Sequence, residues 1–253
     1  MVGSPGREVL SRHLALTREQ HHVDAVIANG ENAAGGFGLT TQTAEDMFAA
    51  GVDFITSGNH IWDKREFRAA LDETDRILRP ANYPPGSPGR GAGTFTAAGV
   101  TIGVLNLMGR VFMPPVDDPF RVADVLVEDL RAITPIIVVD VHAEATSEKM
   151  ALGRFLDGRA SFVYGTHTHV QTSDETIFAG GTGYLTDVGM TGPSDGIIGM
   201  EAATVIDRFT SAVSERFAVQ KTGIRQFCAA LCTIDTRTGR ALDVKRINLR
   251  GLA

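Results

Sequence analysis

The chain has 253 residues, of which 43% are hydrophobic and 21% are charged, and its formal net charge is −6. This length allows one large domain or two small ones with a buried core, and the composition is that of a soluble globular protein. The acidic balance argues against duplex nucleic acid as the main partner, although a metal site could still attract a small anionic substrate. No apolar run has the length of about 20 residues that spans a membrane, and no leader is recognised, so we expect a cytoplasmic protein.

The first two-thirds of the chain predicts an alternation of helices and strands. Ser4 and Pro5 are typical of an N-cap and a first helical residue, so a helix is expected from there to about His22. Further helices are predicted by the segments 41–51, 64–72 and 148–156, and strands by the apolar runs 24–28, 53–57, 101–107, 135–142 and 161–165.

Helix ends and the last third of the chain complete this outline. We expect Gly51 to end the second helix, Asp63 to cap the third and Ser147 to cap the fourth. The Pro/Gly-rich segment 79–93 predicts a long surface loop. The last third predicts a helix near 202–211 among strands at 183–187, 216–220, 227–235 and 241–249. The pattern indicates a single α/β domain over residues 1–253 with more than one sheet.

Cys228 and Cys232 are the two cysteines of the chain. Four positions apart in a strand, they would share one face but lie too far apart to form a disulfide bond. We therefore expect two reduced, buried thiols, as in a cytoplasmic protein.

Polar side chains follow each of the main predicted strands. Parallel strands in an open α/β sheet direct their carboxyl ends to a common crevice, so these side chains are expected to converge. They are Asn29, Glu31 and Asn32, then Asn59 and His60, then His142 and Glu144, then His167 and His169, and finally Asp187.

The chemistry of this set indicates a transition-metal site. Imidazoles combined with carboxylate and amide oxygens, without thiolate, suit Mn, Fe, Zn or Co better than Ca or Mg. His167 and His169 are two positions apart, and in an extended segment both would point to the same side. Each residue alone is also an ordinary loop or turn residue, and Asp187 could be a simple cap. The hypothesis rests on the occurrence of such residues at the ends of several strands together.

Three motifs, "GNHIWD", "VDVHAEATSEK" and "VYGTHTHVQTSDE", together resemble the YmdB-like branch of the calcineurin-type metallophosphoesterases. The resemblance extends over essentially the whole chain, through "NGENAAGG", "RPANYPPGSPG", "NLMGRVFM" and "DVGMTGPSDGIIG". The wider superfamily carries "GDxxD" and "GNHE/D", and the departures "NGEN" and "GNHIW" are characteristic of this branch.

This resemblance implies an α/β fold of the four-layer α/β/β/α sandwich type with two divalent or trivalent transition-metal ions, Fe or Mn first among them. The implied activity is hydrolysis of small phosphodiesters, with 2′,3′-cyclic nucleotides as leading substrates. Carried over by position, Glu31 bridges the ions, Asn32 and His169 bind the first, Asn59, His142 and His167 bind the second, and His60 is the proton donor.

Several alternatives stay open at this stage. One is a degenerate protein that binds metal or nucleotide without turnover, and another is a phosphomonoesterase or nucleotidase with the same site. Arg110 is equally compatible with a phosphate contact and with a surface ion pair. The oligomeric state is open, with a homo-oligomer among the alternatives.

The beginning of the chain departs from the family pattern, which reads roughly "GDVVGSPGRE" where this chain reads "MVGSPGRE". By that comparison the first strand is absent, and a metal-binding Asp would immediately precede Met1. One hypothesis is a start assigned too late, at a GUG valine codon. The competing hypothesis is a true truncation that leaves an inactive or single-metal protein.

Overall fold

The largest sheet of the molecule has six strands in the order β3-β4-β5-β6-β8-β7. The computed structural model describes residues 1–211 and 216–252, so 212–215 and 253 of the predicted domain lie outside it. Strands β4, β5, β6 and β8 are parallel, and β3 and β7 pair antiparallel at the two edges. The bounds are β3 Ala92–Ala97, β4 Val100–Met108, β5 Ile137–His142, β6 Phe162–Thr166, β7 Thr176–Ile177 and β8 Gly183–Leu185.

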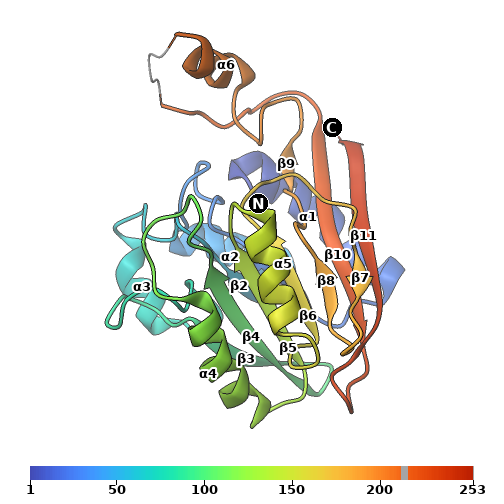
Figure 1. Cartoon of the computed structure of the whole chain (residues 1–253). Coiled ribbons are helices and arrows are strands. Elements are labelled where there is room, and N and C mark those ends of the chain that lie inside the picture. The colour runs from blue at the N-terminus through green and yellow to red at the C-terminus, as the bar shows by residue number, and fades with distance from the viewer. Residues whose placement is uncertain (212–215, 253) are drawn as a thin grey trace.

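Helices α4 (Pro119–Arg131) and α5 (Thr146–Phe155) cover one face of this sheet (Figure 1). Their apolar side chains form a core with alternate residues of the central strands, among them Leu105 and Val139. All six residues of β5 are buried, which indicates that this strand is covered on both faces.

Two smaller sheets lie toward the other face, where Val138 and Tyr164 pack against Ile27 and Ala230. One sheet pairs β1 (Ile27–Asn29) with β2 (Phe54–Thr56) in parallel, and the other has the order β11-β10-β9. Its strands are β9 Gly192–Pro193, β10 Arg225–Ile234 and β11 Ala241–Leu252. The result is a mixed α/β fold with several sheets.

The remaining helices are α1 (Gly3–His21), α2 (Thr41–Ala49), α3 (Phe67–Glu73) and α6 (Ala202–Ser211). Apolar side chains of α1, α2 and α3 share a core with β2 and β10. Helix α6 projects from the body of the molecule (Figure 1). Through Val205 it contacts the small core around Val2 and Met200.

Most predicted elements are confirmed within a few residues, and Gly51 follows α2 with a φ of 106°, as expected for a glycine at a helix end. Three predicted caps are wrong because other contacts determine where these helices begin. Helix α1 begins at Gly3 after Val2, which is held by pairing with Asn32. Helix α3 begins after Glu66 and α5 after Ala145, so neither Asp63 nor Ser147 is a cap.

Further differences concern elements that did not form or were not predicted. Segment 216–220 forms an isolated bridge between Met200 and Val219 and no strand. Helix α4 and strand β3 were not predicted. Strands β7 and β9 were also missed, because two residues each are too few to carry a pattern. Both thiols are free and lie on β10 as predicted, but only Cys228 is buried and Cys232 is half-buried.

An apolar cavity of about 540 Å³ lies between the two smaller sheets. It is bordered by β1 and β10, by Leu10 and Leu14 of α1, and by Phe162 and Tyr164 of β6. In the described residues, β1 pairs with β2 on one edge, and β10 pairs with β11 along its length but with β9 only at Arg225 and Gln226. The facing edges of β1 and β10 are therefore open toward this cavity, which we call the strand groove.

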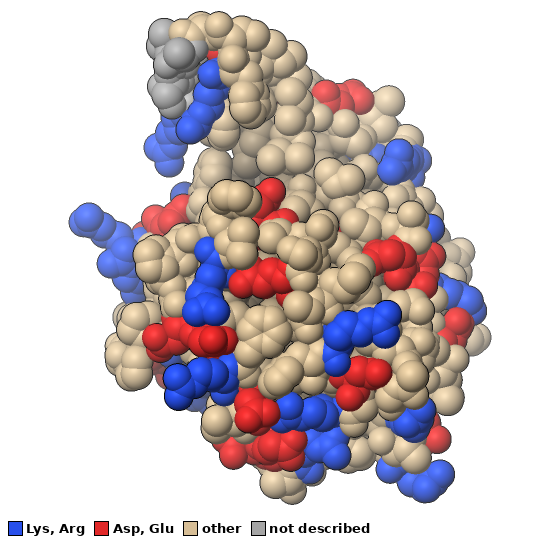
Figure 2. Space-filling model, viewed as in Figure 1, with Lys and Arg blue, Asp and Glu red and all other residues tan. Residues whose placement is uncertain are grey.

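Within residues 1–211 and 216–252, we find no helix that combines the length and the hydropathy of a membrane span. Acidic and basic side chains are interspersed over the face of the molecule shown in Figure 2. That face therefore has no continuous basic surface of the kind that binds duplex phosphates.

Candidate metal centre

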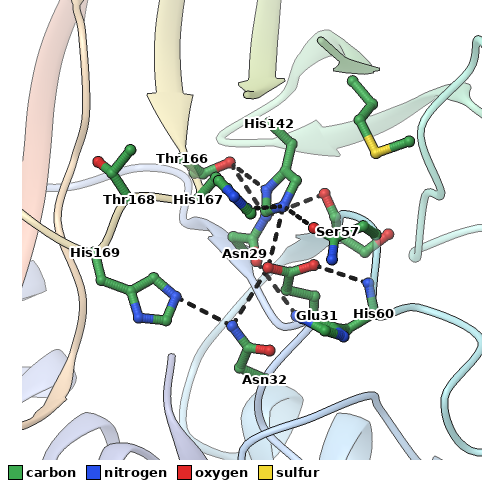
Figure 3. A network of polar contacts seen from close by, with 12 residues as sticks. Asn29, Glu31, Asn32, Ser57, His60, His142, Thr166, His167, Thr168 and His169 are labelled. Carbon is green, nitrogen blue, oxygen red and sulfur yellow. Dashed lines mark hydrogen bonds and ion pairs between the residues drawn. The ribbon is translucent and has the colours of Figure 1, made fainter. Parts of the chain in front are cut away.

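The polar segments that follow β1, β2, β5 and β6 meet at one place, beyond the carboxyl ends of these strands (Figure 3). This convergence follows from the parallel pairing within each sheet, which directs successive strand ends to the same edge. Glu31 and His142 lie at the middle of the group, and both are buried.

His142 contacts three other residues of the group through Nε2. This nitrogen lies 2.9 Å from Asn59 Oδ1, 3.0 Å from His167 Nδ1 and 3.2 Å from Glu31 Oε1. The donor atoms of Glu31, His142 and His167 all lie within 4.8 Å of one another, a spacing that suits a shared metal ion. These are the bridging residue and two of the second-ion ligands that the resemblance implies.

Asn32 and His169 form a second group on the other side of Glu31. Asn32 Nδ2 lies 3.1 Å from His169 Nε2 and donates to Glu31 Oε1 at 3.3 Å. Asn32 Oδ1 is buried without a hydrogen-bond partner among the described residues. A buried amide oxygen without a donor is costly, and a cation would satisfy it.

The other ring nitrogen of His142, Nδ1, contacts the hydroxyl group of Thr166. Thr166 Oγ1 donates to Asp140 Oδ1 at 2.7 Å, so it accepts from His142 Nδ1 at 2.9 Å. With the proton of the neutral imidazole on Nδ1, Nε2 has a lone pair available for a metal ion. Asp140 is fully buried, and burial raises its pKa to about 6.

The other two imidazoles are oriented in the same way. His167 Nε2 lies 3.3 Å from Glu144 Oε2, and His169 Nδ1 donates to the carbonyl of Ile198 at 2.8 Å. In each histidine one nitrogen lies close to an oxygen atom and the other faces the centre, as is general for metal-binding histidines.

Burial keeps these imidazoles neutral. It lowers the pKa of His142 well below its ordinary value, that of His169 to about 4, and that of His167 as well. His142 Nε2 and His167 Nδ1 lie 3.0 Å apart beside Glu31. A neutral imidazole offers one nitrogen lone pair to a metal ion, so the residues present fit a metal ion.

Gly58 leaves space beside these donors. A Cβ built at this position would collide with His142 Nε2 and with Glu31 Oε2. The φ of Gly58 is not in the left-handed region, so the glycine is needed for space and not for backbone conformation.

His60 lies next to the group without joining it. Its backbone N–H donates to Glu31 Oε2 at 3.2 Å, and its ring contacts Phe37 edge-on with centroids 5.0 Å apart. Its Nδ1 lies 2.8 Å from Asp63 Oδ2, which explains why Asp63 is not the predicted cap. Nε2 has no hydrogen-bond partner in the part of the chain that is described.

One geometric expectation was wrong. The segment 167–169 is not extended, because His167 and His169 have φ values of 99° and 66°. Their imidazoles therefore reach the two separate groups on either side of Glu31.

Sequence reasoning missed the residues that orient the imidazoles, Thr166 and Asp140. Asp140 carried a signal, since it is an acidic residue inside the apolar run 135–142. Arg110 ion-pairs with Asp118 at 3.3 Å on the surface, which matches the surface alternative for that residue.

Comparisons with known proteins identify the family of the chain. The family model described as "YmdB-like protein" matches residues 1–247. The 2′,3′-cyclic-nucleotide 2′-phosphodiesterase of Bacillus subtilis is 47% identical over 247 residues, covering 98% of this chain and 93% of that protein.

Two crystal structures have the same fold. A hypothetical protein from Thermus thermophilus has a TM-score of 0.92 at 43% identity, covering 99% of this chain and 96% of that one. A novel phosphatase from Mycoplasma pneumoniae has a TM-score of 0.92 at 32% identity, covering 98% of this chain and 90% of that one. Sequence, fold and the polar groups around Glu31 lead to one assignment: the chain belongs to the YmdB-like protein family.

Proposed function

We propose that this protein is a metal-dependent phosphodiesterase that hydrolyses small phosphodiesters, with 2′,3′-cyclic nucleotides as the leading substrate class. The observation that carries the metal dependence is the convergence of donor atoms from Glu31, His142 and His167 within 4.8 Å of one another. The substrate class is supported by the name of the 47% identical relative from Bacillus subtilis.

Two ion positions are proposed, with Glu31 common to both. Asn59, His142 and His167 would hold one ion, and Asn32 and His169 would hold the other. Nitrogen and oxygen donors without thiolate suit Mn, Fe, Zn or Co, and the family resemblance puts Fe or Mn first. Two such ions, when bound, supply a hydroxide nucleophile and neutralise charge on the phosphate oxygens.

We assign His60 the role of proton donor to the leaving oxygen. A ribose hydroxyl is a poor leaving group and needs a proton as the bond to phosphorus breaks. His60 Nδ1 is held by Asp63 at 2.8 Å, which fixes the ring and leaves Nε2 directed away from that bond. The ring is 29% exposed, so a substrate can reach it.

We also propose that an additional strand occupies the strand groove. The groove is apolar and lies between the open edges of β1 and β10. A strand paired with both would join the two smaller sheets into one, because each edge offers unpaired backbone groups. That sheet, the six-stranded sheet and the helices outside them would form the four-layer α/β/β/α sandwich. The occupant that the family resemblance implies is a strand that ends in Gly-Asp.

The two free thiols agree with a cytoplasmic location. Cys228 and Cys232 both line the groove, and burial raises their pKa values to about 11 and about 12. Thiols of this kind are inert, which suits a structural position in a reducing compartment.

The test compares the chain with a version extended by a family-like strand ending in Gly-Asp. Each is assayed with Mn²⁺ for bound metal, for turnover of 2′,3′-cyclic AMP and for alkylation of the two thiols. We expect the extended protein to bind two ions, to turn over the diester and to react more slowly at the thiols. Metal binding without turnover in both proteins would instead favour a binding protein. Preference for a phosphate monoester would favour a phosphomonoesterase.

A further inference from the structure

Asp187 and Lys149 form an ion pair in the interior, outside the groups that we assign to the metal ions. Lys149 Nζ lies 2.8 Å from Asp187 Oδ2, and each side chain is 1% exposed. Asp187 follows β8, and Lys149 lies in α5. A buried pair of this kind costs desolvation energy, so it is maintained only where further hydrogen bonds satisfy both groups.

Those further bonds go to the ligand loop, which we define as residues 167–169. Asp187 Oδ2 accepts from the backbone N–H of Thr168 at 3.2 Å and from its hydroxyl at 2.8 Å. The other carboxylate oxygen accepts from the N–H of Gly189 at 2.8 Å. One carboxylate thus holds the middle residue of the loop through both its backbone and its side chain.

The ligand loop needs such support. His167 and His169 both have φ in the left-handed region, which side chains with a Cβ rarely adopt. Residues persist in this conformation only where the surrounding structure determines it. Thr168 lies between them, so a carboxylate that fixes Thr168 fixes the direction of both imidazoles.

We propose that Asp187, held in place by Lys149, is a positioning residue that presents His167 and His169 for metal binding through Thr168. This inference rests on the proposed metal centre. It differs from a purely structural role because the bonds to Thr168, and not the ion pair itself, would determine the affinity for metal.

Two double variants separate these roles, since both remove the buried charges. K149M/D187L replaces the pair by apolar side chains and leaves Thr168 without its acceptor. K149M/D187N keeps an amide oxygen that can accept from Thr168. The single variant T168V removes only the hydroxyl bond, so it serves if the leucine variant does not fold.

Mn²⁺ affinity is measured by calorimetry and the ligand field by the visible spectrum of the Co²⁺-loaded protein, with urea midpoints for stability. We expect K149M/D187L to bind Mn²⁺ about 10–100-fold more weakly, with an altered Co²⁺ spectrum, and K149M/D187N to stay within about threefold of the native chain. T168V should be intermediate.

Equal affinity in the native chain and the leucine variant would overturn the inference, and so would an equal loss in both double variants. If T168V alone folds, an unchanged affinity and spectrum would overturn it too. Failure of the native chain to bind Mn²⁺ or Co²⁺ would refute the metal centre itself, and that outcome is distinguishable from the others.

Discussion

Replacing Gly58 by alanine tests the metal centre with a single methyl group. The new Cβ would collide with His142 Nε2 and Glu31 Oε2, so it would occupy the space where these donors converge. The backbone of Gly58 is outside the left-handed region, and alanine there carries no conformational penalty. We therefore expect the substitution to act on metal binding more than on folding.

The magnitude follows from ligand linkage. Mn²⁺ at about 100 times its dissociation constant stabilises a protein by about 2.7 kcal/mol. For a chain of this length that corresponds to a rise in Tm of roughly 5–11 °C, at about 2–4 °C per kcal/mol. In Gly58→Ala this rise should disappear. Overpacking in the metal-free protein should cost about 1–3 kcal/mol, partly offset by about 0.4–1 kcal/mol from the less flexible unfolded chain.

The assay is thermal unfolding with and without Mn²⁺, accompanied by metal analysis. Gly93→Ala is the matched control. Its Cβ would meet Phe54 at 3.4 Å and Leu78 at 3.6 Å, which are ordinary contacts remote from the ligands. The control should retain the full Mn²⁺-dependent rise. An unchanged rise and unchanged metal content in Gly58→Ala would show that His142 and Glu31 do not share an ion.

Three further predictions concern catalysis, the core and the thiols. His60→Ala should lower turnover of a ribose-leaving diester about 10²–10⁴-fold while sparing an activated nitrophenyl diester and the bound metal; equal losses on both substrates would exclude the proton-donor role. Leu105→Ala, in the core beneath α4, should cost about 2–5 kcal/mol by urea unfolding without changing metal stoichiometry. Burial raises the pKa of both thiols, so the folded protein retains protons that the unfolded chain releases, and stability should fall as pH rises above about 9. C228A/C232A should show a shallower fall between pH 8 and 10; an identical fall would mean that other groups cause it.

Much of the fold was predictable from the sequence because most of its elements carry a strong local pattern, but helix α4 and strand β3 were missed. The fully buried β5 appeared as an apolar run that contains Asp140 and ends at His142, and Gly51 follows α2 with a φ of 106°. Caps were less predictable, since a side chain such as Asp63 can bond several partners. Which partner it takes depends on His60, whose position is determined by the loop after β2.

The candidate site was likewise predictable only in part. Residue types and strand ends were enough to predict that Glu31, His142 and His167 would meet. The identity of each second partner was not predictable, because Thr166, Glu144 and Ile198 approach the imidazoles from separate elements.

These second partners determine more than orientation. An imidazole binds metal through a nitrogen that carries no proton, so the acceptor on the far side selects which nitrogen that is. Because Thr166 donates its single hydroxyl proton to Asp140, it can act only as an acceptor toward His142 Nδ1. The Asp140 carboxylate therefore favours, through Thr166, a proton on Nδ1 of His142. The proposed role of Asp187 is indirect in the same way. Asp187 bonds to Thr168, which lies between His167 and His169, and does not contact the proposed ligand atoms of either histidine.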